Sequence, residues 1–484
     1  MTRKFLYFGL LSAMTMAVLY VATENDGENV DVEALAIREH RRLESQAKTN
    51  PETSDLDLQL ANLAKRGRGL PLPSHLQVRR DAGGAYIVVQ PGQEVGAVLP
   101  FPPGQYPAAP SVKPPLDENP GFLGAASCAE CHSETFESFS KTAHHLTSQP
   151  ATTQSILGSF AAQNNTLQTF HPDVSFEMVQ TDGIAVQRTS FLDWKFDIPM
   201  QLIFGSGKIA QSYLYWHGDE LYQCSVTYLS GSQSWINSPG YHDGDADYDR
   251  PIKSRCLECH ATYVDLRAPS NHYTPGSLIA GISCERCHGP GRDHVQYHQA
   301  NPNSKSARFV TVPSDLPRQR ELDVCSQCHS STTPNKGEPF AFRPGDEFKD
   351  HYEEPTGEGG QTVHTSNQLE RLSRSKCFEA TEMTCVDCHN PHQQERGNLA
   401  LFSDRCMKCH QPNTCGMFDE IGDSINQNCI DCHMPVAETK NLRMSTAQGN
   451  VFPPLRDHYI HANRDVADAH LLQKANGDTR ALDK

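Results

Sequence analysis

The sequence contains few of the residues that usually build the core of a protein of this length. Only 37% of its 484 residues are hydrophobic, and tryptophan occurs three times. The mean hydropathy is −0.56. A soluble chain of this length normally divides a larger aliphatic core among two or three domains. We therefore expect some other apolar material to supply part of the interior.

The chain also lacks an excess of basic residues. It has 42 Lys and Arg against 58 Asp and Glu, which gives a net charge of −16. Binding to nucleic acid requires basic patches that neutralise phosphates, so no nucleic acid partner is expected. The charge would steer a basic partner toward the chain, although solubility alone explains it equally well.

Long hydrophobic runs are missing except at the N-terminus. A short positively charged region, Thr2, Arg3 and Lys4, precedes an uncharged stretch over residues 5–22. This pattern is typical of an export signal, and the stretch is just long enough to span a bilayer. Residues 1–22 are therefore expected to be a signal peptide or an N-terminal membrane anchor. Both alternatives place the remaining chain in the periplasm or another extracytoplasmic space, in the second case tethered to the membrane.

Cysteine, in contrast, is abundant, and 14 of the 17 cysteines belong to one repeated pattern, Cys-x-x-Cys-His. The cysteines of the seven copies are Cys128, Cys131, Cys256, Cys259, Cys284, Cys287, Cys325, Cys328, Cys385, Cys388, Cys406, Cys409, Cys429 and Cys432. The histidines that close them are His132, His260, His288, His329, His389, His410 and His433. This is the attachment pattern of c-type haem, in which two thiols bind the porphyrin and the histidine binds the iron as proximal ligand.

The spacing of the pattern has a mechanical reason. On one helical turn, positions i, i+3 and i+4 share a face, so two sulfurs and one imidazole can meet one macrocycle. Structural zinc is the alternative, because paired Cys-x-x-Cys units can supply four thiolates. Zinc ribbons do not need the following histidine, however, and no Cys-x-x-Cys here lacks it. We expect seven haem c groups, or eight if one is held without the pattern. These large apolar cofactors would form much of the core.

The spacing of the motifs suggests a domain organisation. Residues 23–120 are expected to form a polar and proline-rich stalk, with two short helices within 31–67 and a hairpin over 75–90. Residues 121–150 hold the first haem site, and 251–440 form a six-haem region of short helices and loops with little sheet. Residues 441–484 are expected to be a C-terminal tail.

A different kind of sequence separates the first motif from the second. Residues 151–250 are expected to form a β-rich insert, because hairpin patterns occur at 174–191 and 211–229. In the last strand, alternation places Cys224 on the same face as Tyr222 and Val226, which predicts a buried thiol. The expected fold is thus mainly α and irregular, a multihaem cytochrome c fold with a small antiparallel β insert.

Extensions of several motifs resemble the multihaem cytochrome c superfamily. They are CERCHGPGRDH from Cys284, CVDCHNPH from Cys385 and CIDCHMP from Cys429. The likeness covers roughly residues 121–460. The superfamily includes tetrahaem electron carriers, pentahaem nitrite reductase and octahaem hydroxylamine oxidoreductase, so the resemblance specifies redox chemistry but no single activity.

The sixth ligand of each iron decides what that haem can do. A second histidine produces an electron-transfer centre, whereas an open position lets a small molecule bind. The resemblance supports His294 and His392 most directly as distal ligands. Further candidates, taken from their positions near the motifs, are His144 and His364, followed by His298 and His458.

Two functions are compatible with these features. The first is electron transfer between redox partner proteins or a quinol oxidoreductase. The second is catalysis at one five-coordinate haem, acting on nitrite, hydroxylamine, sulfite, tetrathionate or a related nitrogen or sulfur oxide. No Cys-x-x-Cys-Lys, the mark of pentahaem nitrite reductase, is present. Catalytic residues are not identifiable, so the electron carrier is favoured. Two leftover cysteines, Cys377 and Cys415, could form a disulfide or remain thiols.

Overall fold

The computed structural model describes residues 74–80, 86–93, 96–99, 119–181, 183–268, 271–330, 332–355, 362–440 and 442–475. All of them belong to one compact unit. The expected signal or anchor at 1–22, the expected helices within 31–67 and most of the proline-rich stretch lie outside these residues. Among the described helices, none combines the length and the apolar character needed to cross a bilayer.

Two small antiparallel sheets precede the second motif. One has the order β1-β2-β3 and contains the hairpin expected over residues 75–90. The other has the order β5-β6-β7-β8, in which β6 and β7 pair along their whole length. The strands are β1 (Gln77–Arg80), β2 (Tyr86–Val89), β3 (Ala97–Leu99), β5 (Thr166–Gln168), β6 (Val174–Thr181), β7 (Ile184–Phe191) and β8 (Trp194–Pro199).

A larger sheet of eight strands has the order β13-β12-β10-β11-β16-β15, and β9 joins β4 to β10. Its strands are β4 (Ser148–Pro150), β9 (Leu202–Phe204), β10 (Ala210–His217), β11 (Glu220–Gln223), β12 (Val226–Leu229), β13 (Ser234–Asn237), β15 (Leu266–Ala268) and β16 (His272–Tyr273). The strand expected over 220–229 is interrupted between β11 and β12, and Cys224 at the interruption is fully buried, as predicted.

Alternating side chains of these strands build a hydrophobic core that contains no motif cysteine. Phe176 and Met178 from β6 are fully buried, as is Tyr213 from β10. Each buried side chain of this size contributes about 1.5–3 kcal/mol by leaving water. The β-rich region therefore has a conventional core of its own.

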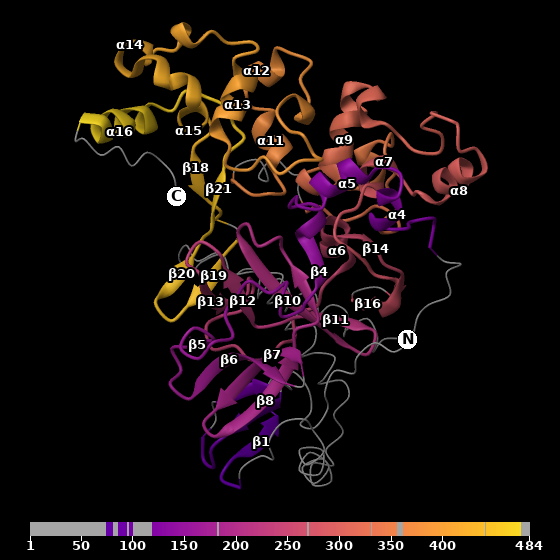
Figure 1. Cartoon of the computed structure of the whole chain (residues 1–484). Coiled ribbons are helices and arrows are strands. Elements are labelled where there is room, and N and C mark those ends of the chain that lie inside the picture. The colour runs from indigo at the N-terminus through magenta and orange to yellow at the C-terminus, as the bar shows by residue number, and fades with distance from the viewer. Residues whose placement is uncertain are drawn as a thin grey trace, which may run out of the picture. The chain divides into compact units, whose positions relative to one another are not determined.

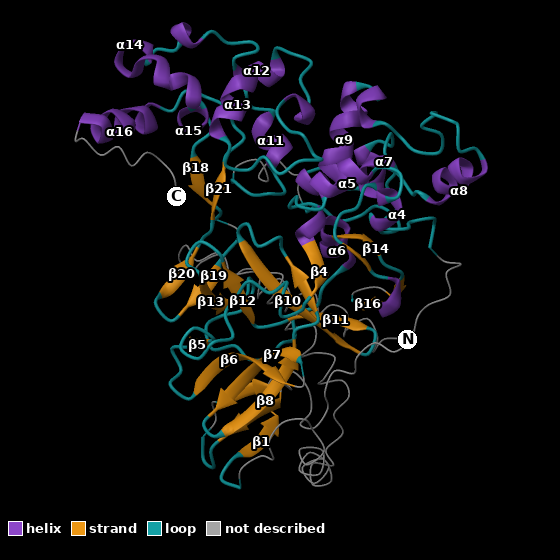
Figure 2. Ribbon diagram, viewed as in Figure 1, coloured by secondary structure: helices purple, strands orange, loops and turns teal. Residues whose placement is uncertain are grey.

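The motif-bearing part consists of short helices joined by loops (Figure 2). The helices are α4 (Ala126–Ala129), α5 (Ser133–Phe139), α6 (Ser254–His260), α7 (Glu285–His288), α8 (Arg292–Ala300), α9 (Arg318–His329), α10 (Phe348–His351), α11 (Gln368–Leu372), α12 (Lys376–Glu379), α13 (Leu399–Cys406), α14 (Phe418–Ile421), α15 (Ile430–His433) and α16 (Arg464–Ala475). Most are too short to be stable alone, so tertiary contacts must hold them.

The expectation of a mainly helical fold is wrong. Helix accounts for 28% and strand for 24% of the structure. Sheet also continues into the region where little was expected, as the pairs β14–β17, β18–β21 and β19–β20. These strands are β14 (Ala261–Tyr263), β17 (Ile279–Ala280), β18 (Val436–Glu438), β19 (Met444–Thr446), β20 (Gly449–Val451) and β21 (Pro454–Arg456). Strands of two or three residues are too short to show a period in sequence.

The last of these hairpins connects the C-terminal segment to the large sheet. β19 and β20 lie beside β13 (Figure 1). Met444 is buried against Leu229 and Ile236, and the Asn237 amide donates to the Ser445 carbonyl at 2.9 Å. Residues 444–451 are therefore packed as part of the fold.

Candidate haem-binding sites

Each Cys-x-x-Cys-His motif forms a single helical turn. In five motifs the histidine N–H donates to the carbonyl of the first cysteine, at distances of 2.9 to 3.1 Å. The other two motifs, which begin at Cys256 and Cys325, lie within α6 and α9. This turn brings two sulfurs and one imidazole to the same face, as attachment of one porphyrin requires.

Four motif histidines face a second histidine from a distant part of the chain. The pairs are His132–His294, His144–His329, His288–His392 and His389–His458, with ring centres 6.5, 6.1, 6.1 and 6.1 Å apart. A metal–nitrogen bond of about 2 Å and a nitrogen-to-centre distance of about 1 Å on each side place the rings of a bis-histidine iron about 6 Å apart. The four separations therefore suit an iron held between each pair.

The structure thus brings four of the six expected distal histidines, His144, His294, His392 and His458, to motif histidines. It does not bring the other two to a motif histidine. His364 Nδ1 is hydrogen-bonded to the Ser366 hydroxyl at 2.7 Å. His298 Nε2 is 3.0 Å from the Ser306 carbonyl oxygen, and its ring lies against His294. All these ligand assignments remain predictions.

Backbone carbonyls orient several of these imidazoles. The Nδ1 atoms of His288, His294 and His329 lie 2.8 Å from the carbonyl oxygens of Thr311, Arg308 and Thr365. A carbonyl accepts from Nδ1–H, which fixes the tautomer and leaves Nε2 unprotonated for a metal. These three contacts therefore suit axial ligation.

Burial keeps two of the paired histidines, His144 and His458, neutral. Burial, reinforced by His329 and His389, lowers the pKa of His144 to about 4. Burial and the neighbouring His389 lower the pKa of His458 to about 4 as well. Only a neutral imidazole has a lone pair for a metal, so these positions are ready to bind iron near neutral pH.

His260 has a different environment. Its ring stacks on Phe204, with centres 4.4 Å apart and planes 14° apart, and its Nδ1 lies 2.9 Å from the Thr147 hydroxyl. Among the residues that the structure describes, no second imidazole is in ring contact with it. The second motif therefore differs from the four paired ones.

The last motif histidine, His433, lies near His410 and near His461, which is not among the six expected distal histidines. Burial lowers the pKa of His433, a backbone hydrogen bond with His461 partly offsets this, and the charges of His410 and His461 lower the pKa further. The Nδ1 of His461 is 2.9 Å from the Tyr459 carbonyl, and the His461 N–H donates to the His433 carbonyl at 3.1 Å. In the sequence, only the position of His461 shortly after His458, in the segment DHYIH, could have indicated that it lies near a haem site.

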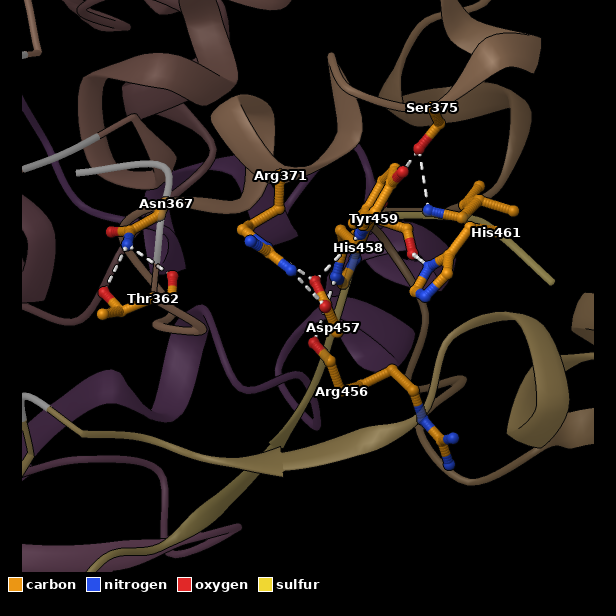
Figure 3. A network of polar contacts seen from close by, with 10 residues as sticks. Thr362, Asn367, Arg371, Ser375, Arg456, Asp457, His458, Tyr459 and His461 are labelled. Carbon is orange, nitrogen blue, oxygen red and sulfur yellow. Dashed lines mark hydrogen bonds and ion pairs between the residues drawn. The ribbon is translucent and has the colours of Figure 1, made fainter. Parts of the chain in front are cut away.

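An ion pair anchors the segment that carries His458 and His461 (Figure 3). Arg371 on α11 binds both carboxylate oxygens of Asp457, and both side chains are less than 10% exposed. Asp457 also accepts from the Tyr459 N–H at 2.9 Å. The Ser375 hydroxyl oxygen accepts from the Ile460 N–H at 2.8 Å. α11 thereby positions His458 opposite His389.

Thiols from different motifs lie next to one another. Direct contacts join the first motif to the third, the second to the fourth, and the fourth to the fifth. They are Cys128–Cys284, Cys259–Cys328 and Cys325–Cys385. The carboxylate of Glu285 strengthens the first of these contacts by accepting from the N–H groups of Leu123 and Gly124, both at 2.7 Å. These thiol contacts form two groups, one of the first and third motifs and one of the second, fourth and fifth. The Gln327 amide of the fourth motif links the groups by donating to the Arg286 carbonyl of the third at 3.1 Å.

Buried arginines near these motifs suit an anionic cofactor. Arg286 is 3% exposed, and its Nε has no hydrogen-bond partner. Burial and the charge of Arg286 together lower the pKa of Arg343. An unpartnered buried guanidinium nitrogen is costly, and the propionates of a haem would supply acceptors of the required charge. The residues present therefore fit haem.

The three cysteines outside the motifs are thiols in the structure. Cys224 belongs to the β core, where burial raises its pKa. Cys377 lies near Cys388, whereas Cys415 lies near Cys429. The two leftover cysteines thus adjoin different motifs, and the structure contains no bridge between them.

Comparison with known proteins gives several similarities. A family model described as cytochrome c554 and c-prime matches residues 222–289, which include the second and third motifs. Dissimilatory sulfite reductase MccA of Wolinella succinogenes is 24% identical over 388 residues, covering 65% of this chain and 50% of that protein. Multiheme cytochrome MtrA of Shewanella baltica is 25% identical over 187 residues, covering 34% and 55%. The chain spans about half the length of these curated relatives.

One solved structure is also similar, the Outer Cell Wall Cytochrome OcwA, with a TM-score of 0.44 and 15% identity over 74% of this chain and 84% of that one. The family match and the curated relatives confirm the resemblance deduced from the motif extensions. They also support haem c as the cofactor, in agreement with the arginine environment described above.

Proposed function

Because this chain belongs to the multihaem cytochrome c superfamily, we propose that it is an extracytoplasmic electron-transfer protein that binds one haem c at each of its seven motifs. The observation that carries the proposal is the spacing of the four histidine pairs, which suits irons with a histidine ligand at each axial position. Six-coordinate haem irons undergo little change of ligands during electron exchange.

When bound, haem c supplies one-electron redox chemistry, and closely packed haems can exchange electrons with one another. The chain's own residues would hold and orient these groups. The motif cysteines would fix each porphyrin, and carbonyls such as that of Thr311 would keep the imidazoles in the ligating tautomer. The contacts between motif thiols, together with the Gln327–Arg286 hydrogen bond between the fourth and third motifs, favour a continuous series of centres that serves redox partner proteins.

The spin state of the irons in the oxidised, fully loaded protein tests this proposal. Electron paramagnetic resonance should show that most irons are low-spin, including those of the four paired sites. Replacement of His144 by Ala should convert one low-spin centre to high-spin without releasing haem. A protein whose paired sites are already high-spin would contradict the proposal.

A second function is favoured by the environment of His260. Four motif histidines have an imidazole opposite them, whereas His260, His410 and His433 have none in ring contact among the described residues; of these three, His260 alone is stacked on a phenyl ring, that of Phe204. An iron at this site would have a position open to a small molecule, as catalysis requires. One relative is a sulfite reductase, so reduction of sulfite or a similar oxide at the second motif is the alternative activity.

Addition of sulfite distinguishes the two functions. If the second motif is catalytic, the native protein should contain one high-spin iron whose spectrum changes with sulfite, nitrite or hydroxylamine. The reduced protein should then be reoxidised by that compound. A protein whose irons are all low-spin, and whose spectrum and oxidation state do not change when these compounds are added, would leave electron transfer as the function.

A further inference from the structure

The loop that follows α8 presents cationic and aromatic side chains on the surface. Lys305, Arg308 and Phe309 are all exposed, and Phe309 retains 53% of its accessible surface. The Arg308 guanidinium carbon lies 5.5 Å from the ring centre of Tyr297 and 5.3 Å from that of Phe309. We call residues 305–309 together with Tyr297 the α8 patch. Figure 1 shows α8 at the margin of the helical part.

The backbone of the patch is held in an unusual conformation. Phe309 has φ of +65°, which a bulky residue rarely adopts. Two histidines, His294 and the motif histidine His288, hold the chain before and after it. The Arg308 carbonyl is bonded to His294 Nδ1, and the Thr311 N–H donates to the His288 carbonyl at 2.8 Å. The strained residue exposes its aromatic ring to solvent, which packing of the core does not explain.

The patch adjoins the first motif directly. His294, which is bonded to the Arg308 carbonyl, is also the histidine that faces His132. Cys131 and His132 are themselves exposed. Among the described motifs, the first has a direct thiol contact with the third only. The α8 patch therefore lies beside the first motif, which has a thiol contact with one other motif.

The local charge differs from that of the whole chain. Segment 292–314 contains Arg292, Lys305 and Arg308 but a single acidic residue, Asp293, whereas the chain carries −16 overall. Among the described residues, Lys305 and Arg308 have no carboxylate partner. Arginine and aromatic side chains are enriched at the centres of protein interfaces, and unpaired cations around them select a partner of opposite charge.

We propose that the α8 patch is the docking site of a redox protein with an acidic face. One electron would leave the reduced partner and be taken up at the first motif, with no bond made or broken. The inference rests on the proposed electron-transfer function, because it assigns the entry or exit point of that function.

Stopped-flow reduction of the fully loaded, full-length protein tests the inference. The probe is a reduced, strongly acidic [2Fe–2S] ferredoxin at low ionic strength. Charge reversal in the double variant Lys305→Glu/Arg308→Glu should lower the bimolecular rate constant roughly tenfold or more, and high salt should abolish the difference. Phe309→Ala should lower the rate while leaving its salt dependence intact.

A matched control is Lys208→Glu, which reverses an exposed charge in the loop between β9 and β10. It should slow the ferredoxin reaction less than twofold. Unchanged low-spin spectra of all variants would show that the His132–His294 pair is intact. This is the expected result, because Arg308 is bonded to His294 through its backbone carbonyl, which the substitution retains.

Three results would overturn the inference. The double variant and Lys208→Glu could slow the reaction equally, which would indicate that the overall charge of the protein, and not the α8 patch, sets the rate. The wild-type rate could be independent of salt. Sedimentation could show that the wild type self-associates and the double variant does not, which would make a second copy of the chain the occupant. Rapid reduction of all haems by dithionite in any of these cases would leave the proposed function standing, whereas haems that cannot be reduced would refute that function.

Discussion

Replacement of Asp457 by Ala should open the fifth haem site. Asp457 and Arg371 are 8% and 9% exposed, and two hydrogen bonds join them. Breaking one partner of such a buried ion pair costs about 3–5 kcal/mol. The variant also loses the acceptor for the Tyr459 N–H. Because 1.4 kcal/mol is a factor of about ten, release of the segment that carries His458 should become at least 100-fold more favourable.

The assay combines thermal unfolding with electron paramagnetic resonance. Because the entropy of unfolding grows with chain length, about 3 kcal/mol corresponds in a compact unit of this size to a fall in Tm of roughly 3–5 °C. The same variant should convert one low-spin iron, that of the His389 site, to high-spin. The matched control is Asp197→Ala, which removes a similar two-bond ion pair with Arg188 in the sheet of β7 and β8. It should lower Tm without changing any spin state.

Two outcomes would refute this reasoning. If Asp457→Ala lowers Tm but leaves the low-spin signals unchanged, the ion pair does not position His458. If Asp197→Ala produces the same high-spin signal, the signal reports general destabilisation. Either outcome would remove the role assigned to α11.

Three further predictions concern the same sites. His294→Ala should produce one high-spin iron at the first motif, whereas His298→Ala should not, because His298 Nε2 is already bonded to a carbonyl; the visible and paramagnetic resonance spectra compare them. Burial alone would raise the pKa of Asp457, but its hydrogen bonds with Arg371 and the Tyr459 N–H outweigh burial and lower it. The stabilisation that ionised Asp457 gives the folded state is therefore complete above about pH 4, and it is lost as the pH falls through the lowered pKa of the folded state. An acid titration should therefore show loss of the His458 ligand from the His389 site over that range. Expression without haem attachment should leave the motif-bearing helices sensitive to protease while the sheet of β5 to β8 resists, because that sheet has its own core; equal digestion of both regions would contradict this.

Much of the binding chemistry could be predicted from sequence because it is local. Cysteines and histidine within five residues fall on one helical turn whatever surrounds them, and the structure forms that turn in each motif. Long alternating strands such as β6 and β7 were also predictable, since eight residues display a period of two. The short strands from β14 onward were not, and the expectation of a mainly helical fold failed there.

The second histidines show the limit of local reasoning. His294 and His392 follow motifs closely, yet each faces a motif far from its own in sequence. His461 lies beside His433 but is not among the six distal candidates taken from the sequence. Nothing in the spacing of His298 distinguishes it from His294. The structure distinguishes the two histidines. The Nε2 of His298 is bonded to the Ser306 carbonyl, whereas His294 is bonded to the Arg308 carbonyl through Nδ1, which leaves its Nε2 for a metal.

The sequence by itself determined the cofactor class and the proximal positions, because covalent attachment depends on residues within one turn. Only the tertiary structure decided which histidines are paired, that His260 is set against Phe204, and that the first motif lies beside an exposed patch of cations and aromatic rings. The physical reason is that pairing depends on distance in space between segments up to 185 residues apart, as for His144 and His329. Such distances are set by packing, and no local pattern encodes them.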